Sequence, residues 1–468
     1  MKSHGISRRR FLAALAAAAS PALGAAPAAD AEADVIIVGS GFGGLAAAIE
    51  ARRAGAEVLL VEKMAALGGN SSLSAGDMAV PDSPVQRSLG IAGDSPELMA
   101  SDLIHNAGAD PARARTVAGH ALETWRWTAE QLGVDWNMSR IQGDWGQSVP
   151  RGITLTSRSG FSIVQACTQA LERLKAGVRT ECRLVAPVFE GGRAAGIEAE
   201  GAAGERLFLR ARRGIVMAYG GFSADAAFRS SLNPLLTAGI PTSNQPGATS
   251  EAWRAMIDAG AGMLDLDRIQ VMCWNSPDER GLGQAWTFIE YVTVPLGQWF
   301  DTSDGTPLLG ADRSPRARTE TLLPRCAAGH AVLAAVSQKA VEESGFSREQ
   351  AAALTAQGIL RTYGSPEALA AELGCSPAAM LAAMPSRDAG EQRFCALSVT
   401  PKVHHCQGGL RIDAQARVYS REGRVMPGLY AAGECTGGLF RRERLPSHSV
   451  ADALVTGRIA GVSAAGRV

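Results

Sequence analysis

The sequence has little cysteine for its length of 468 residues, and none of its eight cysteines has the spacing of a redox or metal motif. No two of them form a C-x-x-C pair, and no C-x-x-C-H haem attachment site is present. Eight cysteines are also too few for a disulfide scaffold in a chain this long. We therefore expect buried thiols, no metal site and no c-type haem on this chain.

Net charge is also absent, because 46 basic and 46 acidic side chains cancel at neutral pH. This composition gives no hint of nucleic acid or of an anionic surface as a partner. Outside the first residues there is no run of roughly 20 apolar residues without charges or glycine, so we expect no integral membrane segment. The length suits two domains with separate cores.

The N-terminus has the pattern of an export signal. Ser7-Arg8-Arg9-Arg10-Phe11-Leu12 is a twin-arginine motif, and a short Ala-rich region with small residues follows it. We expect residues 1–31 to be a signal peptide that sends the folded protein to the periplasm. This route carries folded cargo, so the signal itself predicts a cofactor that is inserted before export.

A dinucleotide-binding pattern follows directly. The apolar run 34–38 predicts a buried parallel strand, and Gly39-Ser40-Gly41-Phe42-Gly43-Gly44 after it fits G-x-G-x-x-G. A helix is expected over 45–55 and a second strand over 57–61, ending at Glu62. The glycines allow a tight turn, close approach of the pyrophosphate and close packing of the helix, while the helix N-terminus attracts phosphate. Glu62 is placed to accept hydrogen bonds from a ribose.

Three further glycine-rich elements favour FAD over a shorter dinucleotide. They are the loop at 67–76, the strand and glycines at 214–222, and the strand and glycines at 428–434, which bring Glu434 toward the ribityl chain. Elements spread so widely along the chain indicate one long ligand wrapped by a discontinuous domain.

With these elements in view, the chain resembles the soluble fumarate reductase and flavocytochrome c flavoprotein family, whose relatives include urocanate reductases and 3-ketosteroid dehydrogenases. Besides the glycine motifs, the resemblance rests on 404–410 (HHCQGGL), on 444–449 (RLPSHS) and on the closing helix at 453–461. It implies an α/β fold with a Rossmann-type, GR2-like FAD-binding domain at 32–230 and 395–468, a helical excursion at about 80–150, and an inserted α+β capping domain at 231–394. Since the second glycine loop has no His, the flavin is expected to be noncovalent.

The residues expected to bind FAD are Gly39, Gly41, Phe42, Gly43, Gly44, Glu62, Lys63, Gly69, Asn70, Ser71, Ser74, Gly76, Gly220, Asp225, Gly433, Glu434, Ser449 and Val450.

The resemblance also implies the chemistry, which is hydride transfer from flavin N5 to the β-carbon of an activated double bond, followed by protonation of the α-carbon. His404 and Arg444 match the residues that grip the substrate carboxylate. His405 is expected to bind substrate as well, and the alternatives are that it orients its neighbour or contacts the flavin. An arginine suits this task because its planar fork binds a carboxylate through two hydrogen bonds.

The expected cap departs from the family pattern. Met272 replaces a His that holds a second carboxylate, and Thr293 replaces an arginine, although Glu290 matches a glutamate of the proton path. The proton-donating arginine is expected at Arg313 or Arg316, with Arg318 also open because spacing does not choose among them. These changes argue against a simple dicarboxylate substrate. The nearby aromatic residues Trp274, Trp286 and Tyr291 suggest a larger, flatter substituent, or they are core packing.

A third departure concerns the flavin contacts, because Pro446-Ser447-His448 stands where the family has Gly-Gly-Asn. Proline lacks a backbone N–H, so the set of available donors changes there.

We therefore expect an exported enoate reductase that acts on a small-molecule α,β-unsaturated carboxylate. Its electrons would come from a separate protein, such as a cytochrome c or a quinol-linked chain. One alternative is an FAD dehydrogenase that desaturates a ketosteroid-like or acyl substrate. Another is a catalytically idle flavin-binding protein.

Overall fold

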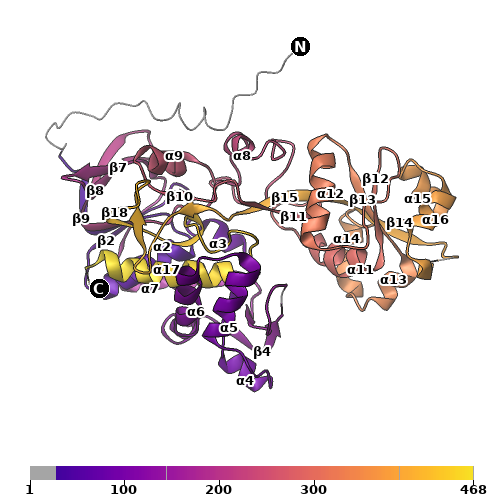
Figure 1. The fold of residues 1–468 in the computed structure, drawn as a ribbon, viewed down its shortest axis with the longest axis horizontal. Helices are drawn as coiled ribbons and strands as arrows, with labels where there is room; N and C mark the ends of the chain where they lie inside the picture. Colours follow the sequence, from indigo (N-terminus) through magenta and orange to yellow (C-terminus); the bar gives the residue numbers. More distant parts are fainter. Residues whose placement is uncertain (1–27, 144, 389, 467–468) are drawn as a thin grey trace, which may run out of the picture. The chain divides into compact units, whose positions relative to one another are not determined.

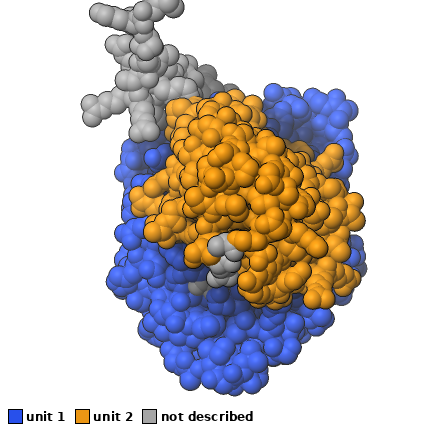
Figure 2. Space-filling view, turned by 90° about the vertical axis from the view of Figure 1, so that its right-hand side faces the viewer, with its two compact units in different colours: residues 1–222, 247–268, 406–468 blue, residues 223–246, 269–405 orange. Residues whose placement is uncertain are grey.

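The structure, a computed structural model, describes residues 28–143, 145–388 and 390–466. The twin-arginine motif therefore lies outside the described residues. The chain forms two compact units, each of which is described by itself (Figure 2). Unit 1 contains residues 1–222, 247–268 and 406–468, and unit 2 contains residues 223–246 and 269–405.

Unit 1 is built on a largely parallel sheet, with the elements that are expected to bind the dinucleotide at its centre (Figure 1). Strand β1 (Ala31–Val38) pairs in parallel with β2 (Val58–Val61) on one side and β9 (Arg206–Met217) on the other. β18 (Val425–Ala431) adds in parallel to β9, although about 200 residues of chain separate them. The apolar side chains of β1 from Val35 to Val38 are all buried, as expected for a strand covered on both faces.

The remaining strands extend this sheet at its edges. In the part of the chain that the structure describes, the sheet has eight strands, in the order β17-β18-β9-β1-β2-β6, with β8 also paired to β9 and β7 paired to β8. The bounds are β6 (Gly177–Arg179), β7 (Arg183–Glu190), β8 (Arg193–Glu200) and β17 (Arg417–Tyr419).

Helices α2 (Phe42–Arg53) and α17 (His448–Ala464) pack closely against each other, because small residues line their contact. A Cβ at Gly457 would lie 2.3 Å from the backbone oxygen of Gly43, and one at Gly461 would lie 2.2 Å from that of Ala47. Both helices are buried over most of their surface, so they form the core beside the sheet.

Other elements of unit 1 surround this core. Helices α4, α5, η1, α6 and η2 fall within residues 80–150, and a small sheet of β3, β5 and β4 flanks them. The bounds are α3 (Gly69–Leu73), β3 (Met78–Ala79), α4 (Pro84–Ser88), α5 (Pro96–Asp102), η1 (Leu103–Ala107), α6 (Pro111–Arg126), η2 (Trp127–Gln131), β4 (Trp136–Gln142), β5 (Gly152–Leu155), α7 (Phe161–Arg173), α9 (Glu251–Asp258), β10 (Met263–Leu264), β16 (Gly409–Leu410) and η5 (Gly433–Cys435).

Unit 2 has its own sheet and its own hydrophobic clusters. Among the residues described, its sheet has five strands, in the order β11-β15-β13-β12 with β14 beside β15. One cluster forms around Phe288, Trp299 and Leu397, and the other around Phe300 and Phe394. The bounds are α8 (Ala226–Leu232), β11 (Ile269–Asn275), α10 (Ala285–Phe288), η3 (Ile289–Thr293), α11 (Val294–Leu296), β12 (Gln298–Asp301), α12 (Pro315–Ala327), β13 (Val332–Ser337), α13 (Gln338–Glu343), α14 (Arg348–Ala356), β14 (Arg361–Tyr363), α15 (Pro366–Glu372), α16 (Pro377–Ala383), η4 (Ser386–Asp388) and β15 (Phe394–Cys406).

The predicted fold class is confirmed, since a mixed α/β structure with a central parallel sheet is what the sequence indicated. Within the described ranges, no helix combines the length and the apolar character needed to cross a bilayer.

Candidate active site

The glycine turn after β1 has the geometry that a bound pyrophosphate requires. Gly39 has φ +99°, and a Cβ there would lie 2.4 Å from the backbone oxygen of Ala218. A Cβ at Gly44 would lie 1.9 Å from the oxygen of Gly39, so α2 can reach the strand only with glycine at this position. Gly41 caps α2 without a side-chain hydrogen bond, so the positive end of the helix, which attracts phosphate, lies at this turn.

Glu62 lies at the end of β2 and holds this turn from the side. Its Oε2 accepts hydrogen bonds from the backbone N and the Oγ of Ser40, at 3.0 and 2.6 Å. Its Oε1 accepts from Met64 N at 2.9 Å. The neighbouring Lys63 points elsewhere, since its Nζ contacts Thr249 Oγ1 at 2.5 Å and Glu251 at 3.4 Å.

The second glycine loop lies beside the first turn. Ser71 Oγ accepts a hydrogen bond from Phe42 N at 2.9 Å, which joins the start of α3 to the start of α2. Ser74 Oγ donates to Ser71 O at 2.8 Å, and Gly76 has φ +76°. Four residues predicted to bind cofactor therefore come together here: Phe42, Ser71, Ser74 and Gly76.

Glu434 joins three segments that are far apart in the sequence. Its Oε1 accepts from Cys406 N at 2.9 Å, and Asn70 and the backbone of Gly221 also donate to its carboxylate. Burial raises the pKa of Glu434 more than these hydrogen bonds lower it, so the net shift is upward. Gly220, with φ +73°, lies next to this point, and its oxygen accepts from Trp253 Nε1 at 3.2 Å. The structure thus brings together Asn70, Gly220 and Glu434, three of the residues expected to bind FAD.

The segment before α17 carries Arg444. Its Nη1 donates to Ser449 Oγ at 3.2 Å, in the first turn of the helix beside Val450. Arg444 also lowers the pKa of Glu434 by its charge, so the arginine lies near the cofactor side of unit 1. Ser447 has φ +65°, which is a left-handed backbone conformation that favours glycine. The resembled family has glycine at this position.

His448 is the first residue of α17, and its ring contacts the segment that precedes the helix. The ring is fully buried, and its Nδ1 donates to Pro446 O at 2.8 Å. Burial lowers the pKa of His448 to about 4, with a further contribution from the charge of Arg151, so the ring is neutral at physiological pH. In the portion of the chain that is described, its Nε2 has no hydrogen-bond partner.

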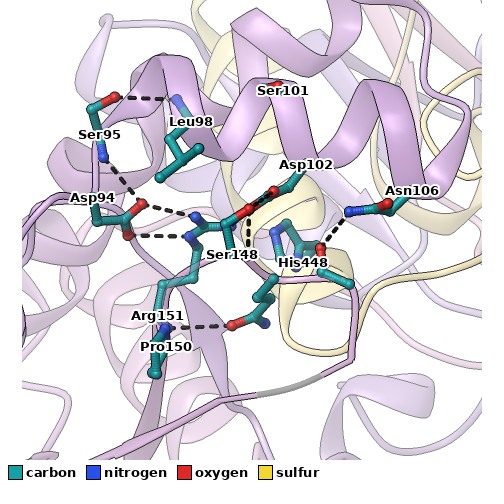
Figure 3. A network of polar contacts seen from close by, with 12 residues as sticks. Asp94, Ser95, Leu98, Ser101, Asp102, Asn106, Ser148, Pro150, Arg151 and His448 are labelled. Carbon is teal, nitrogen blue, oxygen red and sulfur yellow. Dashed lines mark hydrogen bonds and ion pairs between the residues drawn. The ribbon is translucent and has the colours of Figure 1, made fainter.

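A buried ionic cluster holds the same segment, and the sequence analysis missed it (Figure 3). Arg151, fully buried, binds Asp94 through two hydrogen bonds of 3.1 and 2.8 Å and Asp102 through one of 2.6 Å. Gln147 accepts from Arg151 N and donates to Pro446 O, both at 3.3 Å. No local pattern marks these four residues, because they are joined only by the fold.

In unit 2, His404 is held at the end of β15. Its Nδ1 lies 2.7 Å from Ser243 Oγ, and its backbone oxygen accepts from Asn244 Nδ2 at 2.7 Å. His405 follows it in the same strand. Asp225, expected to bind cofactor, lies in unit 2 and caps α8 by accepting from Phe228 N at 2.9 Å.

The three candidate arginines of the cap have different surroundings. Arg313 donates to the backbone oxygens of Val294 and Gly297. Arg318 is buried, binds Glu290 at 2.6 and 3.2 Å and stacks on Trp274 with 4.8 Å between guanidinium carbon and ring centroid. The side chain of Arg316 is 80% exposed and pairs with Glu320 at 2.8 Å.

The buried position of Met272 in β11 fits its apolar side chain. Trp286 and Tyr291 contact each other, with ring centroids 6.1 Å apart. No group of three or more metal-ligating side chains occurs among the described residues.

Comparison with known proteins agrees with this geometry. Residues 34–450 match the family described as "FAD binding domain". The chain is 34% identical to the acrylate reductase flavoprotein subunit of Shewanella woodyi over 97% of both chains. It is 28% identical to a fumarate reductase (cytochrome) of Shewanella frigidimarina over 92% of this chain and 77% of that protein.

Among solved structures, the open conformation of a flavocytochrome c3 fumarate reductase superposes with a TM-score of 0.81 at 23% identity. The match covers 100% of this chain and 82% of that one, and it shows the shared fold.

Proposed function

The chain belongs to the FAD binding domain family and is an FAD-dependent oxidoreductase acting on CH–CH bonds, and from this we propose that it reduces the C=C bond of an α,β-unsaturated monocarboxylate. The proposal includes export by the twin-arginine route and noncovalent binding of FAD.

The observation that carries the proposal is the placement of Arg444. It lies in the segment that leads into α17, contacts Ser449 and acts electrostatically on Glu434, which joins three of the cofactor-binding segments. An arginine held there offers a planar fork to a carboxylate next to the cofactor. When the guanidinium neutralises the negative charge of the carboxylate, the attached C=C bond becomes more electron-poor and accepts a hydride more readily.

A monocarboxylate suits the cap better than a dicarboxylate. Met272 stands where the resembled family has a His for the second carboxylate, and it is buried. Acrylate is the simplest compound of this class, and a relative that matches over nearly the whole chain is named an acrylate reductase.

Reduced FAD, when bound, supplies a hydride for the β-carbon of the substrate. The protein must then deliver a proton to the α-carbon. We assign this task to Arg316, because its side chain is exposed and pairs with a carboxylate, whereas Arg313 donates to carbonyl oxygens, which hold no proton to return, and Arg318 is buried. Since the pKa of an arginine exceeds about 12, a carboxylate must reload it, and Glu320 lies 2.8 Å away. Glu290 then acts on Arg316 only indirectly. It binds Arg318, which lies two residues after Arg316 in α12, and so fixes the position of this helix.

The electron donor is proposed to be a separate protein, a cytochrome c or a quinol-linked chain. The sequence has no haem attachment motif of its own. The relative from Shewanella woodyi is named as one subunit of its enzyme, which agrees with a separate donor.

The first prediction concerns Arg444. Arg444→Ala should lower kcat/KM for acrylate by about a hundredfold, because a charge-assisted, two-point contact with the carboxylate is lost. Arg444→Lys should recover only part of this loss, because lysine cannot form the planar fork. The measurement is steady-state reduction with an artificial electron donor, at FAD occupancy verified by absorbance.

The matched control is Arg441→Ala, which removes an exposed arginine of the same segment that pairs with Asp265. This variant should keep its activity. Full turnover of Arg444→Ala with every enoate tested would contradict the assigned carboxylate contact.

A further inference from the structure

The hydrogen bonds around His404 determine which of its ring nitrogens carries the proton. The nearest contact is between Nδ1 and Ser243 Oγ, at 2.7 Å. Ser243 is 6% exposed, so water does not compete freely for its hydroxyl. A hydroxyl can donate or accept, and its other contacts therefore decide its direction.

Asn244 supplies the first of these contacts. Its Nδ2 donates to His404 O at 2.7 Å, which fixes the orientation of the amide, because the amide oxygen would repel a carbonyl oxygen at that distance. The second N–H of the same group points to Ser243 Oγ at 3.4 Å. An amide N–H can only donate, so Ser243 Oγ accepts from Asn244 and has its own proton left to give.

Two acceptors compete for that proton. Val403 O lies 3.5 Å from Ser243 Oγ, and it already accepts from Ser243 N at 3.0 Å and from Thr242 Oγ1 at 2.8 Å. His404 Nδ1 lies much closer to Ser243 Oγ, at 2.7 Å instead of 3.5 Å. The hydroxyl therefore donates to Nδ1, which must then be unprotonated in the neutral ring.

We propose that Ser243 and Asn244 are positioning residues that set His404 in the tautomer with its proton on Nε2. The inference rests on the proposed function, and it takes His404 as a second residue that binds the substrate carboxylate beside Arg444, the role that the resemblance implies for it. A carboxylate accepts hydrogen bonds and cannot donate them, so only a protonated nitrogen can bind it. The direction of donation runs from Asn244 to Ser243, from Ser243 to Nδ1, and from Nε2 to the substrate.

The backbone keeps this arrangement in place. Val403 N donates to Pro241 O at 2.9 Å, and Thr242 forms a parallel bridge with Val403. The segment with Ser243 and Asn244 is thus fastened to the strand that carries His404. All of these residues belong to unit 2, so the assignment does not depend on how the two units meet.

The test compares Ser243→Ala with Ser243→Thr in the FAD-loaded protein. Ser243→Ala should raise KM for acrylate by about tenfold, the usual cost of a lost hydrogen bond to a buried group, and should change kcat by less. Ser243→Thr keeps the hydroxyl and should restore KM to within about threefold. The same order of effects should appear in the Kd of propionate, a non-reacting acid, measured from the change in flavin absorbance. Ser337→Ala removes another buried serine of unit 2, one that caps α13 and binds Asp388, and should leave both values unchanged.

A double-substitution cycle separates this inference from the proposed function. His404→Gln should raise KM, and adding Ser243→Ala to it should have no further effect, because Ser243 acts through the ring. If His404→Gln leaves KM unchanged, the proposed role of His404 fails. If His404→Gln raises KM and Ser243→Ala does not, only the positioning role is overturned.

The tautomer itself can be read in the protein with its own Ser243 and Asn244. In FAD-loaded protein with ¹⁵N-labelled histidine, the His404 resonances, assigned by their loss in His404→Gln, should show a protonated Nε2 and a bare Nδ1. A protonated Nδ1 would overturn the inference.

Discussion

His448, the first residue of α17, places a polar imidazole ring in a fully buried position. Its Nδ1 binds Pro446 O, and the same carbonyl accepts from Gln147, so two donors fix the turn that precedes α17. Ser447 between them has a left-handed backbone. Side chains therefore hold this turn, at positions where the resembled family has glycines. Protonation of the buried His448 ring would lower the stability of the folded protein.

A pH dependence of stability follows. The pKa of His448 is lowered by burial from 6.5 to about 4, so the unfolded chain binds a proton below about pH 6.5 and the folded protein does not until about pH 4. Stability is therefore lost as the pH falls through this window, by roughly 3 kcal/mol in total. His448→Gln should lack this component. The measurement is the free energy of urea unfolding of both proteins between pH 7 and 4, and parallel pH curves would contradict it.

At the level of single residues, a position can be predicted from sequence where it has one physical solution. Only glycine fits the backbone contacts at Gly39 and Gly44, and the glycine-ended strands bring Glu434 to Asn70, while binding of FAD by these residues stays a prediction. Arg151 could not be predicted, because its partners Asp94 and Asp102 are 57 and 49 residues away in the sequence and meet it only in the folded chain. The pairing of Glu290 with Arg318 was likewise beyond the reach of spacing.

At the level of elements, the tight contact between α2 and α17 positions both the phosphate turn and Arg444. The first helix begins at the glycine turn, and the second begins four residues after Arg444. Since glycines of α17 lie against the backbone of α2, the spacing between the two helices has no slack.

Gly461→Ala should therefore be strongly destabilising. Its Cβ would lie 2.2 Å from the backbone oxygen of Ala47, and overpacking of this kind costs about 1–3 kcal/mol, which outweighs the gain of up to about 1 kcal/mol from replacing a helical glycine. Gly119→Ala in α6 is the control, because the added Cβ would meet no atom within 4 Å. This variant should be more stable, since alanine is favoured over glycine inside a helix. Thermal unfolding of both variants decides the matter, and equal shifts in Tm would contradict the close-packing account.

The elements themselves were predictable because each has a strong local signal. The strands at 34–38 and 57–61 and the helix between them appear as β1, β2 and α2, with bounds that differ by a few residues. The cap gave weaker signals, since its short strands alternate with amphipathic helices and its sheet forms from segments far apart, such as β11 and β15.

On the scale of the whole molecule, the first unit is completed only when the last 60 residues return to it. β18 joins the sheet beside β9, η5 presents Glu434, and α17 closes against α2. The elements expected to bind FAD therefore come from segments far apart in the chain, and they meet only once this unit has folded.

The most direct test of the account is anaerobic reoxidation of the protein-bound flavin. FAD-loaded protein is reduced, freed of excess reductant and mixed with acrylate and a panel of longer enoates. The account predicts that at least one monocarboxylate enoate restores the oxidised flavin spectrum, with one saturated acid formed per FAD. A flavin that stays reduced with every enoate would contradict it, and reduction of the oxidised flavin by a ketosteroid or a saturated acyl compound would assign the opposite reaction.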